Sequence, residues 1–444
     1  MANSTPSASD YKGIVGPLLH RCSHCQTAGP KLLRCNGCLA VRYCSREHQT
    51  AHWPKHKSAC SKIKKARAKL AQEDHAVRNA TEDFMTPANA FESHAGHFWK
   101  VINTRDYMRA RMALAMKLLQ QATLGSVSEA YEHMRDMLRL NRSDNMGIRD
   151  MVPALMLRLD LDQECYDFVK WWATCDPDGR YDWGNMDLPH LDLHGADVFE
   201  KPEFLLVKHS DLNALVALLL LNLKLLVDIR NLKITRKILS RTRLPTELRD
   251  KIQRAVIRSP LSTKLKKEAP GSLLQTESTL MNHIRLLGAA LNETNGQFMF
   301  NLFDPDEALC SMPEAYSRGS WEEMAYSIQH SYAAWWETEG VLDLLKDARM
   351  CAARDSEDEI EDIMDTDTFR SSAGPNRTAK ELLEDMSVNR IWGYLDYAAE
   401  NACYLGPWSE RPSEQHTRVN KENWARAEEE DDEEWSDDED EVVF

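Results

Sequence analysis

Four closely spaced pairs of cysteine and histidine residues stand near the start of the chain. In order, they are Cys22 with Cys25, Cys35 with Cys38, Cys44 with His48, and His56 with Cys60. Thiolate and imidazole groups are the ligands that Zn²⁺ prefers, and a structural zinc ion takes four of them in a tetrahedron. A two-residue gap lets both sulfurs of a pair reach one ion, and a three-residue gap places both ligands on one face of a helical turn. Eight ligands therefore predict two closed, structural zinc sites.

The residues around these pairs resemble the MYND zinc finger, in Tyr43-Cys44-Ser45 and in Gln49-x3-Trp53-x2-His56. The resemblance implies interleaved sites, in which the first and third pairs bind one ion and the second and fourth pairs bind the other. Spacing alone leaves sequential filling open. The chain departs from the family at His48, where the family usually has Cys. Both sites are then Cys₃His, and we expect the first ion to be held less tightly.

Three further histidines, His20, His24 and His52, lie in or beside the finger. We interpret them as lying outside the ligand set, with His52 as the alternative to His48. A finger of this size buries too little apolar surface to fold alone. Metal binding must therefore supply most of its folding free energy.

The same resemblance implies a protein-binding surface. In MYND fingers a groove beside the short hairpin accepts a proline-containing peptide, and the matching positions here are Ser45, Gln49 and Trp53. An exposed strand edge next to an aromatic side chain is a reasonable arrangement for docking an extended peptide. The alternative is that Trp53 forms the small core of the finger, and the two roles are compatible.

Charge is unevenly distributed along the chain. Residues 1–70 carry 13 Lys or Arg and 2 Asp or Glu, whereas the net charge of the whole chain is −15. The stretch 55–69 is basic and predicted to be helical, and basic patches bind phosphate groups without sequence preference. No aromatic residues alternate with these cations, and no recognition-helix module is recognisable. We interpret the stretch as a solvated helix face, and we keep a nucleic-acid-associated transcriptional regulator as the alternative function.

Cysteine usage indicates a reducing compartment, because five of the 11 cysteines are scattered singly outside the finger. The first ten residues contain no apolar core of signal-peptide length. The most apolar run, 212–227, is interrupted by Asn222 and Lys224, which predicts a buried helix rather than a membrane span. We expect an intracellular protein, nuclear or cytoplasmic, without a membrane partner.

Apolar residues recur at helical spacing beyond the finger, as in Tyr131, Met134 and Leu138. A helix through residue 140, a polar turn and a second helix to Leu159 resemble a tetratricopeptide-type unit. Arg142 replaces the usual proline of the turn, and no second copy follows at a clean 34-residue period. A long loop is expected over residues 174–204, and the layout as a whole resembles that of fungal MYND proteins.

The fold class that we predict is mainly α, with a small two-zinc MYND finger, an α-helical tetratricopeptide-like domain and a disordered acidic tail. The tail prediction follows from residues 428–441, of which 12 are acidic. The expected order is a disordered segment at 1–21, the finger at 22–60, the helical domain at 61–350, an acidic linker at 351–378, a short helical segment at 379–410 and the disordered tail at 411–444.

The enzyme class to be weighed is the SET-like lysine methyltransferases, one group of which contains a MYND finger. There the finger is inserted within the catalytic domain, whereas only 21 residues precede Cys22 here. No Asn-His-x-Cys segment follows, since Asn282-His283 continues as Ile284-Arg285, and phosphate-loop, zincin and nucleophile-elbow motifs are missing. The sequence therefore favours a zinc-binding protein–protein interaction adaptor that is not an enzyme, with a methyltransferase as the least favoured alternative.

Overall fold

The computed structural model describes residues 17–82, 86–208, 210–366 and 378–401. The fold is mainly α-helical, as predicted, and the chain divides into two compact units. We call residues 17–200 the finger unit and the part that follows residue 200 the C-terminal unit. This boundary differs from the single helical domain that we expected over residues 61–350. The predicted tail at 411–444 lies outside the described residues.

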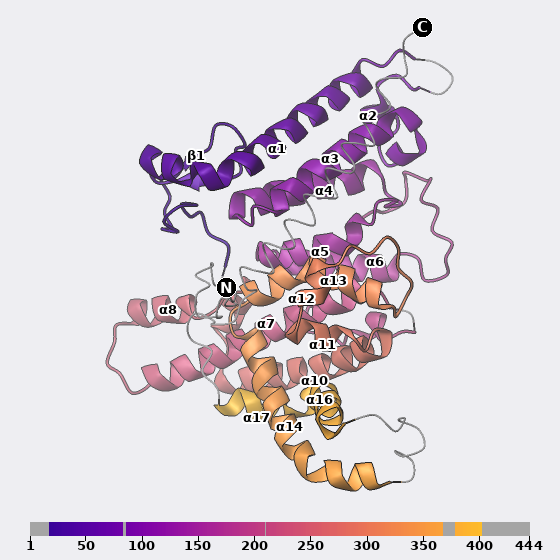
Figure 1. Ribbon diagram of the computed structural model, residues 1–444. Helices are drawn as coiled ribbons and strands as arrows, with labels where there is room; N and C mark the ends of the chain where they lie inside the picture. Colours follow the sequence, from indigo (N-terminus) through magenta and orange to yellow (C-terminus); the bar gives the residue numbers. More distant parts are fainter. Residues whose placement is uncertain (1–16, 83–85, 209, 367–377, 402–444) are drawn as a thin grey trace, which may run out of the picture. The chain divides into compact units, whose positions relative to one another are not determined.

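The finger unit starts with a short hairpin and continues as a series of helices (Figure 1). Strand β1 (Leu33–Arg34) pairs antiparallel with β2 (Arg42–Tyr43). The helices that follow are α1 (Arg46–Arg78), α2 (Ala90–Ser93), η2 (Phe98–Lys100), η3 (Ile102–Thr104), α3 (Arg105–Leu119), α4 (Leu124–Leu140), α5 (Ile148–Arg158) and α6 (Asp162–Thr174). Residues 17–21, for which we predicted disorder, are ordered: Leu18 is buried and Arg21 forms a β-bridge with Ala28.

Helix α1 crosses the expected end of the finger at residue 60. Ser45 caps its start, because the Ser45 Oγ accepts a hydrogen bond of 3.3 Å from the backbone N–H of His48. The helix then runs for 33 residues. Beyond the last zinc ligand it buries Ile63 and Ala66, and it packs along α3 (Figure 1). The finger and the following helices therefore share one helix.

Helices α3 to α6 form the part of the chain that we compared with a tetratricopeptide unit. Each packs on the next, and the short connections between them make neighbours antiparallel. The periodic residues Tyr131, Met134 and Leu138 of α4 are buried, as the sequence predicted. The loop after α6 is also as expected, and Asp167 fastens it by accepting hydrogen bonds from the backbone N–H groups of Gly195 (2.7 Å) and Ala196 (2.9 Å).

Within the described residues, all secondary-structure elements of the C-terminal unit are helices. Its elements are η4 (Glu203–Leu205), α7 (Leu212–Leu239), α8 (Thr246–Ala255), α9 (Ser262–Leu265), α10 (Pro270–Thr294), α11 (Phe298–Phe303), α12 (Asp306–Cys310), α13 (Trp321–Glu337), α14 (Val341–Asp365), α16 (Ala379–Asn389) and α17 (Ile391–Asn401).

Helix α7 is the centre of the C-terminal unit and contacts α8, α9, α10, α13 and α14. Among the described residues it is the one helix long and apolar enough to cross a membrane, but 89% of its apolar window is buried inside the protein. This burial confirms the predicted core helix. Two cations of α7, Arg230 and Lys233, pair with Glu277 of α10, whose side chain is 7% exposed. The core of this unit therefore contains an ion cluster.

The acidic linker predicted at 351–378 is wrong for residues 351–365, because these residues continue helix α14. Ala352, Ser356 and Ile360 are buried at a spacing of four residues, which extends the buried stripe of the helix under the acidic run. Asp355, Glu357, Asp358 and Glu359 are exposed, and Glu359 accepts a hydrogen bond of 2.7 Å from Arg390. Buried side chains at helical spacing thus keep an acidic segment folded.

The short helical segment predicted from residue 379 consists, in its described part, of two helices, α16 and α17. Trp392 of α17 is 7% exposed and packs against α10 at Gly288, where an added Cβ would lie 2.3 Å from a ring carbon of Trp392. Tyr397 of the same helix is 65% exposed, so it and Trp392 have different environments.

Substituting Gly288→Ala should destabilise the C-terminal unit by about 1–3 kcal/mol through overpacking against Trp392. Alanine is the better helix former by about 1 kcal/mol, so a loss of stability would show that the clash is the larger effect. Gly271→Ala in the same helix is the control, because no atom lies within 4 Å of the place that its Cβ would take. Urea unfolding of both variants tests this, and equal stability would contradict the packing described.

Candidate metal centre

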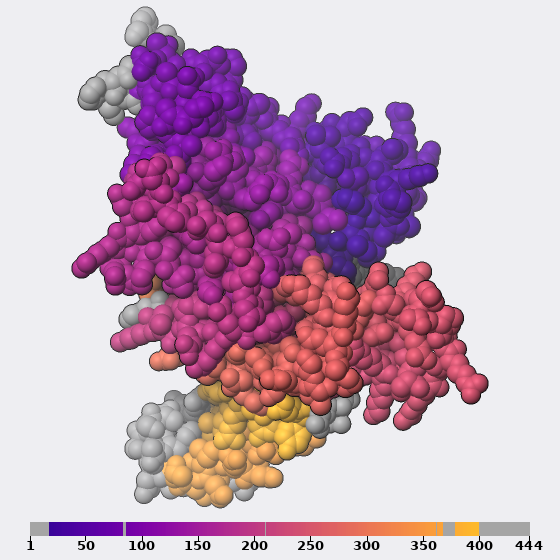
Figure 2. Space-filling model, turned by 180° about the vertical axis from the view of Figure 1, so that it is seen from behind, coloured from indigo at the N-terminus to yellow at the C-terminus, as the bar shows by residue number. Residues whose placement is uncertain are grey.

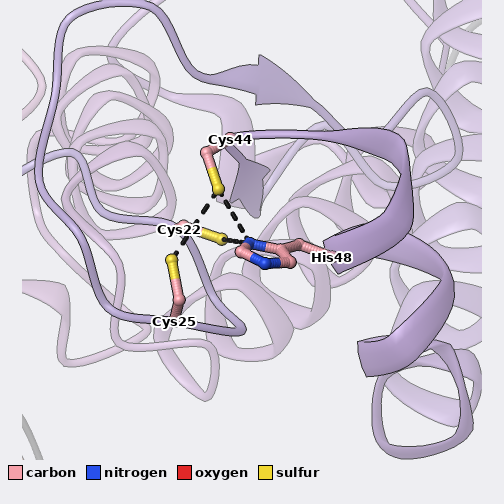
Figure 3. A group of neighbouring side chains, drawn as sticks. All are labelled: Cys22, Cys25, Cys44 and His48. Atoms are coloured by element: carbon pink, nitrogen blue, oxygen red, sulfur yellow. Dashed lines mark hydrogen bonds between the residues drawn. The ribbon is translucent and has the colours of Figure 1, made fainter.

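Four of the predicted ligands, Cys22, Cys25, Cys44 and His48, converge on one point (Figure 3). The Sγ atoms of Cys25 and Cys44 are 3.7 Å apart, and the His48 Nδ1 lies 3.6 Å from the Cys22 Sγ and 2.8 Å from the Cys44 Sγ. Cys25 and Cys44 are exposed, whereas Cys22 is buried. We call this group the open site.

The other four ligands, Cys35, Cys38, His56 and Cys60, form a second group in which every member is buried. The Sγ atoms of Cys35 and Cys60 are 3.8 Å apart, and the His56 Nε2 lies 3.4 Å from the Cys38 Sγ. We call this group the buried site. The first and third pairs thus share one group and the second and fourth pairs share the other, which is the interleaved arrangement.

The spacing of the donors fits zinc. Bond lengths of about 2.3 Å to sulfur and 2.0–2.1 Å to nitrogen place tetrahedral ligands about 3.8 Å (S to S) and about 3.6 Å (S to N) apart. Both sulfur–sulfur distances and two of the sulfur–nitrogen distances agree with these values, while Cys44 and His48 stand closer together. Four protein donors complete each tetrahedron, so the two zinc ions are structural.

The backbone repeats one design at both cysteine knuckles. The carbonyl of Cys22 accepts a hydrogen bond from the N–H of Gln26, and the carbonyl of Cys35 accepts one from the N–H of Leu39. The residue after the second cysteine is left-handed in both, with φ 60° at Gln26 and 62° at Leu39. In the buried knuckle Gly37 is required by space, because a Cβ there would lie 2.8 Å from the Cys60 Sγ.

Thiols with raised pKa values occur in both sites, since desolvation raises the pKa of Cys44 in the open site to about 11. Burial, with the neighbouring Cys38 thiol adding to it, raises the pKa of Cys60 to about 12. Burial also raises the pKa of Cys38. Thiols of such pKa become ligands only when the metal displaces their protons, so zinc binding releases protons and weakens as the pH falls. Once zinc is bound, burial keeps chelators and water away from the ligands of the buried site.

Chelation should therefore remove the two zinc ions in two phases. We expect the ion at the open site to leave first, because Cys25 and Cys44 are exposed and a competing ligand reaches them directly. His48→Cys, which gives the open site a fourth thiolate and so a further negative charge, should slow the first phase and leave the second unchanged. Zinc release to a colorimetric chelator measures both rates, and a single phase that releases both ions together would contradict the asymmetry.

The remaining histidines lie outside both groups. His52 shares a hydrogen bond of 3.0 Å between its Nδ1 and the Tyr43 hydroxyl, and its ring stacks on His56. His24 lies with its ring centre 4.8 Å from that of His48. His52 therefore supports the ligand His56 and is not the alternative to His48.

The three candidate peptide-binding residues have different settings. Ser45 caps α1, and Gln49 is half-buried one turn later. Trp53 is 42% exposed, and its ring edge packs against the ligand His56 with ring centres 6.1 Å apart. Within the described part of the chain, β1 pairs only with β2, so its outer edge is available for a further strand.

Sequence reasoning missed the link between the buried site and the helices. Arg67 of α1, interpreted as part of a solvated basic face, donates to the Cys38 carbonyl from its Nε (3.1 Å) and Nη2 (2.9 Å). The same guanidinium pairs with both carboxylate oxygens of Glu129 on α4. Although burial opposes ionisation, hydrogen bonds from His133 and Arg67 lower the pKa of Glu129 to about 2. The partners are 62 residues apart in sequence, so no local pattern reveals them.

A second hydrogen bond ties the finger to the start of α4. The hydroxyl of Thr123, the cap residue of α4, donates to the backbone carbonyl of Ala40 over 2.8 Å. Ala40 and Val41, which lie between the buried knuckle and β2, are themselves buried. The buried site is thus connected to the helices by two hydrogen-bonded links.

Comparison with known proteins identifies the finger. Residues 22–60 match the family described as the MYND finger. The ubiquitin carboxyl-terminal hydrolase 17 of Arabidopsis thaliana is 32% identical over 91 residues, which are 20% of this chain and 12% of that protein. The chain thus spans about an eighth of the length of this curated relative. No solved structure matches the chain.

Proposed function

We propose that this chain, which carries a MYND finger at residues 22–60, is an adaptor whose finger docks proline-containing peptides and whose helices bind further partners. The MYND finger is a zinc-dependent protein–protein interaction domain, and that coarser role applies here. The observation that supports peptide docking is the exposed indole of Trp53 on the helix that follows the hairpin.

The free edge of the hairpin supports an extended ligand. Helix α1 contacts β2, and β2 pairs with β1, so the free edge of the hairpin is the edge of β1. A peptide added at that edge gains backbone hydrogen bonds, while an exposed aromatic ring offers contact area for a proline. Leu33 in β1 is 63% exposed, which adds apolar surface to the same strand.

A catalytic role is not proposed for either zinc ion. Each ion has four protein ligands, so no coordination position is left for water or substrate. The hydrolase activity in the name of the Arabidopsis relative belongs to that protein, whose match to this chain spans 91 residues. We propose an intracellular adaptor, nuclear or cytoplasmic, that acts by binding.

Trp53→Ala should weaken capture of a proline-containing peptide at least about thirtyfold, the range of an interface hot spot, because a central aromatic contact is removed. The peptide is first selected from a proline-containing library with the wild-type protein, and binding is then measured by fluorescence anisotropy. Zinc content should stay at two ions per chain, since Trp53 is not a ligand. Tyr397→Ala, which removes another exposed aromatic ring, is the control. If the Trp53 variant binds the peptide as tightly as the wild type, the peptide-binding site lies on the helices and not on the finger.

A further inference from the structure

The exposed face of α1 carries cations on both sides of Trp53. Arg46, Trp53, Lys57 and Lys64 are all exposed and are separated by seven, four and seven residues, so they lie on one stripe of the helix. We call these four residues the α1 stripe. Figure 2 shows the finger residues in indigo, with side chains projecting to solvent.

Lys57 and Lys64 of the α1 stripe have no acidic partner among the described residues, in contrast to Arg67 and Lys69 of the same helix. Arg67 is engaged by Glu129, and Lys69 pairs with Glu73 over 3.0 Å. Arg46, Lys57 and Lys64 form no ion pair within the part of the chain that the structure describes. Between residues 17 and 72 the sequence has one acidic residue, Glu47, whose carboxylate is engaged by Ser45. No carboxylate in the described ranges therefore pairs with Lys57 or Lys64, whereas Arg46 interacts electrostatically with the adjacent Glu47.

We infer that the peptide recognised by the finger is acidic, with Asp or Glu residues on both sides of the apolar residue that meets Trp53. The inference rests on the proposed peptide docking and names its specificity. Complementary charge speeds association and disfavours basic competitors, which is how exposed cations around an apolar contact select a ligand.

The helix geometry sets the spacing of the acidic residues. At 1.5 Å per residue, Arg46 lies about 10 Å from Trp53 along the axis, Lys57 about 6 Å and Lys64 about 16 Å. An extended peptide advances about 3.3 Å per residue. For a peptide segment that runs along α1 past Trp53, acidic residues about three positions from the apolar centre on one side, and about two and five positions on the other, would meet the three cations.

A single-stranded nucleic acid is the competing occupant, and the structure favours the peptide. Sequence-tolerant binding of single strands uses several aromatic rings on which successive bases stack. The α1 stripe presents one ring, Trp53, whose edge is already held by His56. A single aromatic ring flanked by cations matches a peptide in which one apolar residue is flanked by carboxylates. It matches a run of stacked bases less well.

The test compares three versions of the selected peptide in the full-length protein, with Glu, Gln or Lys at the flanking positions. At 50 mM salt the Glu peptide should bind roughly tenfold more tightly than the Gln peptide, and the difference should shrink with added salt. Lys57→Glu/Lys64→Glu should remove this preference and favour the Lys peptide. Lys237→Glu/Lys251→Glu changes the net charge equally at exposed positions of the C-terminal unit and should keep the wild-type preference.

The outcomes separate the two proposals. Equal binding of the Glu and Gln peptides, both lost in Trp53→Ala, would overturn the acidic preference and leave peptide docking intact. Binding that never depends on Trp53 would overturn both. If an oligothymidine displaces the Glu peptide at a lower concentration than the Glu peptide itself requires, the α1 stripe would be assigned to nucleic acid. That result would overturn the proposal.

Discussion

Replacing Cys38 with serine is expected to abolish the buried zinc site and to loosen α1 along its contact with α3. Cys38 supplies a ligand through its sulfur, and its carbonyl accepts the hydrogen bonds of Arg67. Structural zinc contributes on the order of 10 kcal/mol to the folding of small fingers, so its loss exceeds what the hairpin and knuckles can replace. If the finger were a separate module, the damage would end at residue 60. The shared helix extends the expected damage into the finger unit.

The measurement combines zinc analysis with hydrogen exchange. Zinc content should fall to one ion or fewer per chain, and amide protection in α1 beyond Cys60 should fall at least tenfold, while α10 of the C-terminal unit keeps its protection. Cys25→Ser is the matched ligand loss at the open site and should leave α1 beyond Cys60 protected. Cys351→Ser, outside both sites, should change neither quantity. Full protection of α1 in Cys38→Ser would show that the finger folds as a separate module.

Replacing Glu277 with alanine should destabilise the C-terminal unit by about 3–5 kcal/mol. The carboxylate pairs with Arg230 and lies 2.6 Å from the Lys233 Nζ. Arg230 is 11% exposed, so it would remain as a buried cation without its counter-charge. The penalty comes from this uncompensated charge and not from the attraction alone.

A double replacement distinguishes the two contributions. Glu277→Met/Arg230→Met removes both charges of the buried pair and should recover most of the lost stability, since apolar side chains of similar size replace a buried pair at little loss. Asp396→Asn breaks an exposed pair with Arg285 in the same unit and should change stability by less than about 1 kcal/mol. Urea unfolding followed by hydrogen exchange in α7 and α10 measures all three. Equal destabilisation by the alanine and asparagine variants would refute the buried role of Glu277.

The zinc ligands were readable from sequence because their chemistry is concentrated in a short stretch. Eight donors at knuckle and helical spacing leave few arrangements, and the family resemblance selected the interleaved one that the structure contains. The helices were readable because Tyr131, Met134 and Leu138 repeat at helical period and are buried. Peptide docking at Ser45, Gln49 and Trp53 stays a prediction.

The features that sequence reasoning placed wrongly depend on long-range contacts or on small residues. The acidic composition after residue 350 suggested a linker, but Ala352, Ser356 and Ile360 give α14 a buried stripe that composition does not reveal. The end of the finger unit at residue 200 arises because the loop after α6 is bonded back to Asp167. The role of Arg67 requires Glu129, which no spacing rule connects to it.

The length of α1 has a consequence for how a bound partner is held. A helix of 33 residues is a rod about 50 Å long. Trp53 stands near one end of this rod, and α3 braces the rest. A ligand bound at Trp53 would therefore have a fixed orientation relative to the finger unit, which a flexible linker would not give. If the same unit holds a second binding site, avidity between the two sites depends on the fixed distance between them. A ligand whose two binding segments are spaced a few ångströms too far apart would then lose this avidity, whereas a flexible linker between the sites would tolerate the mismatch.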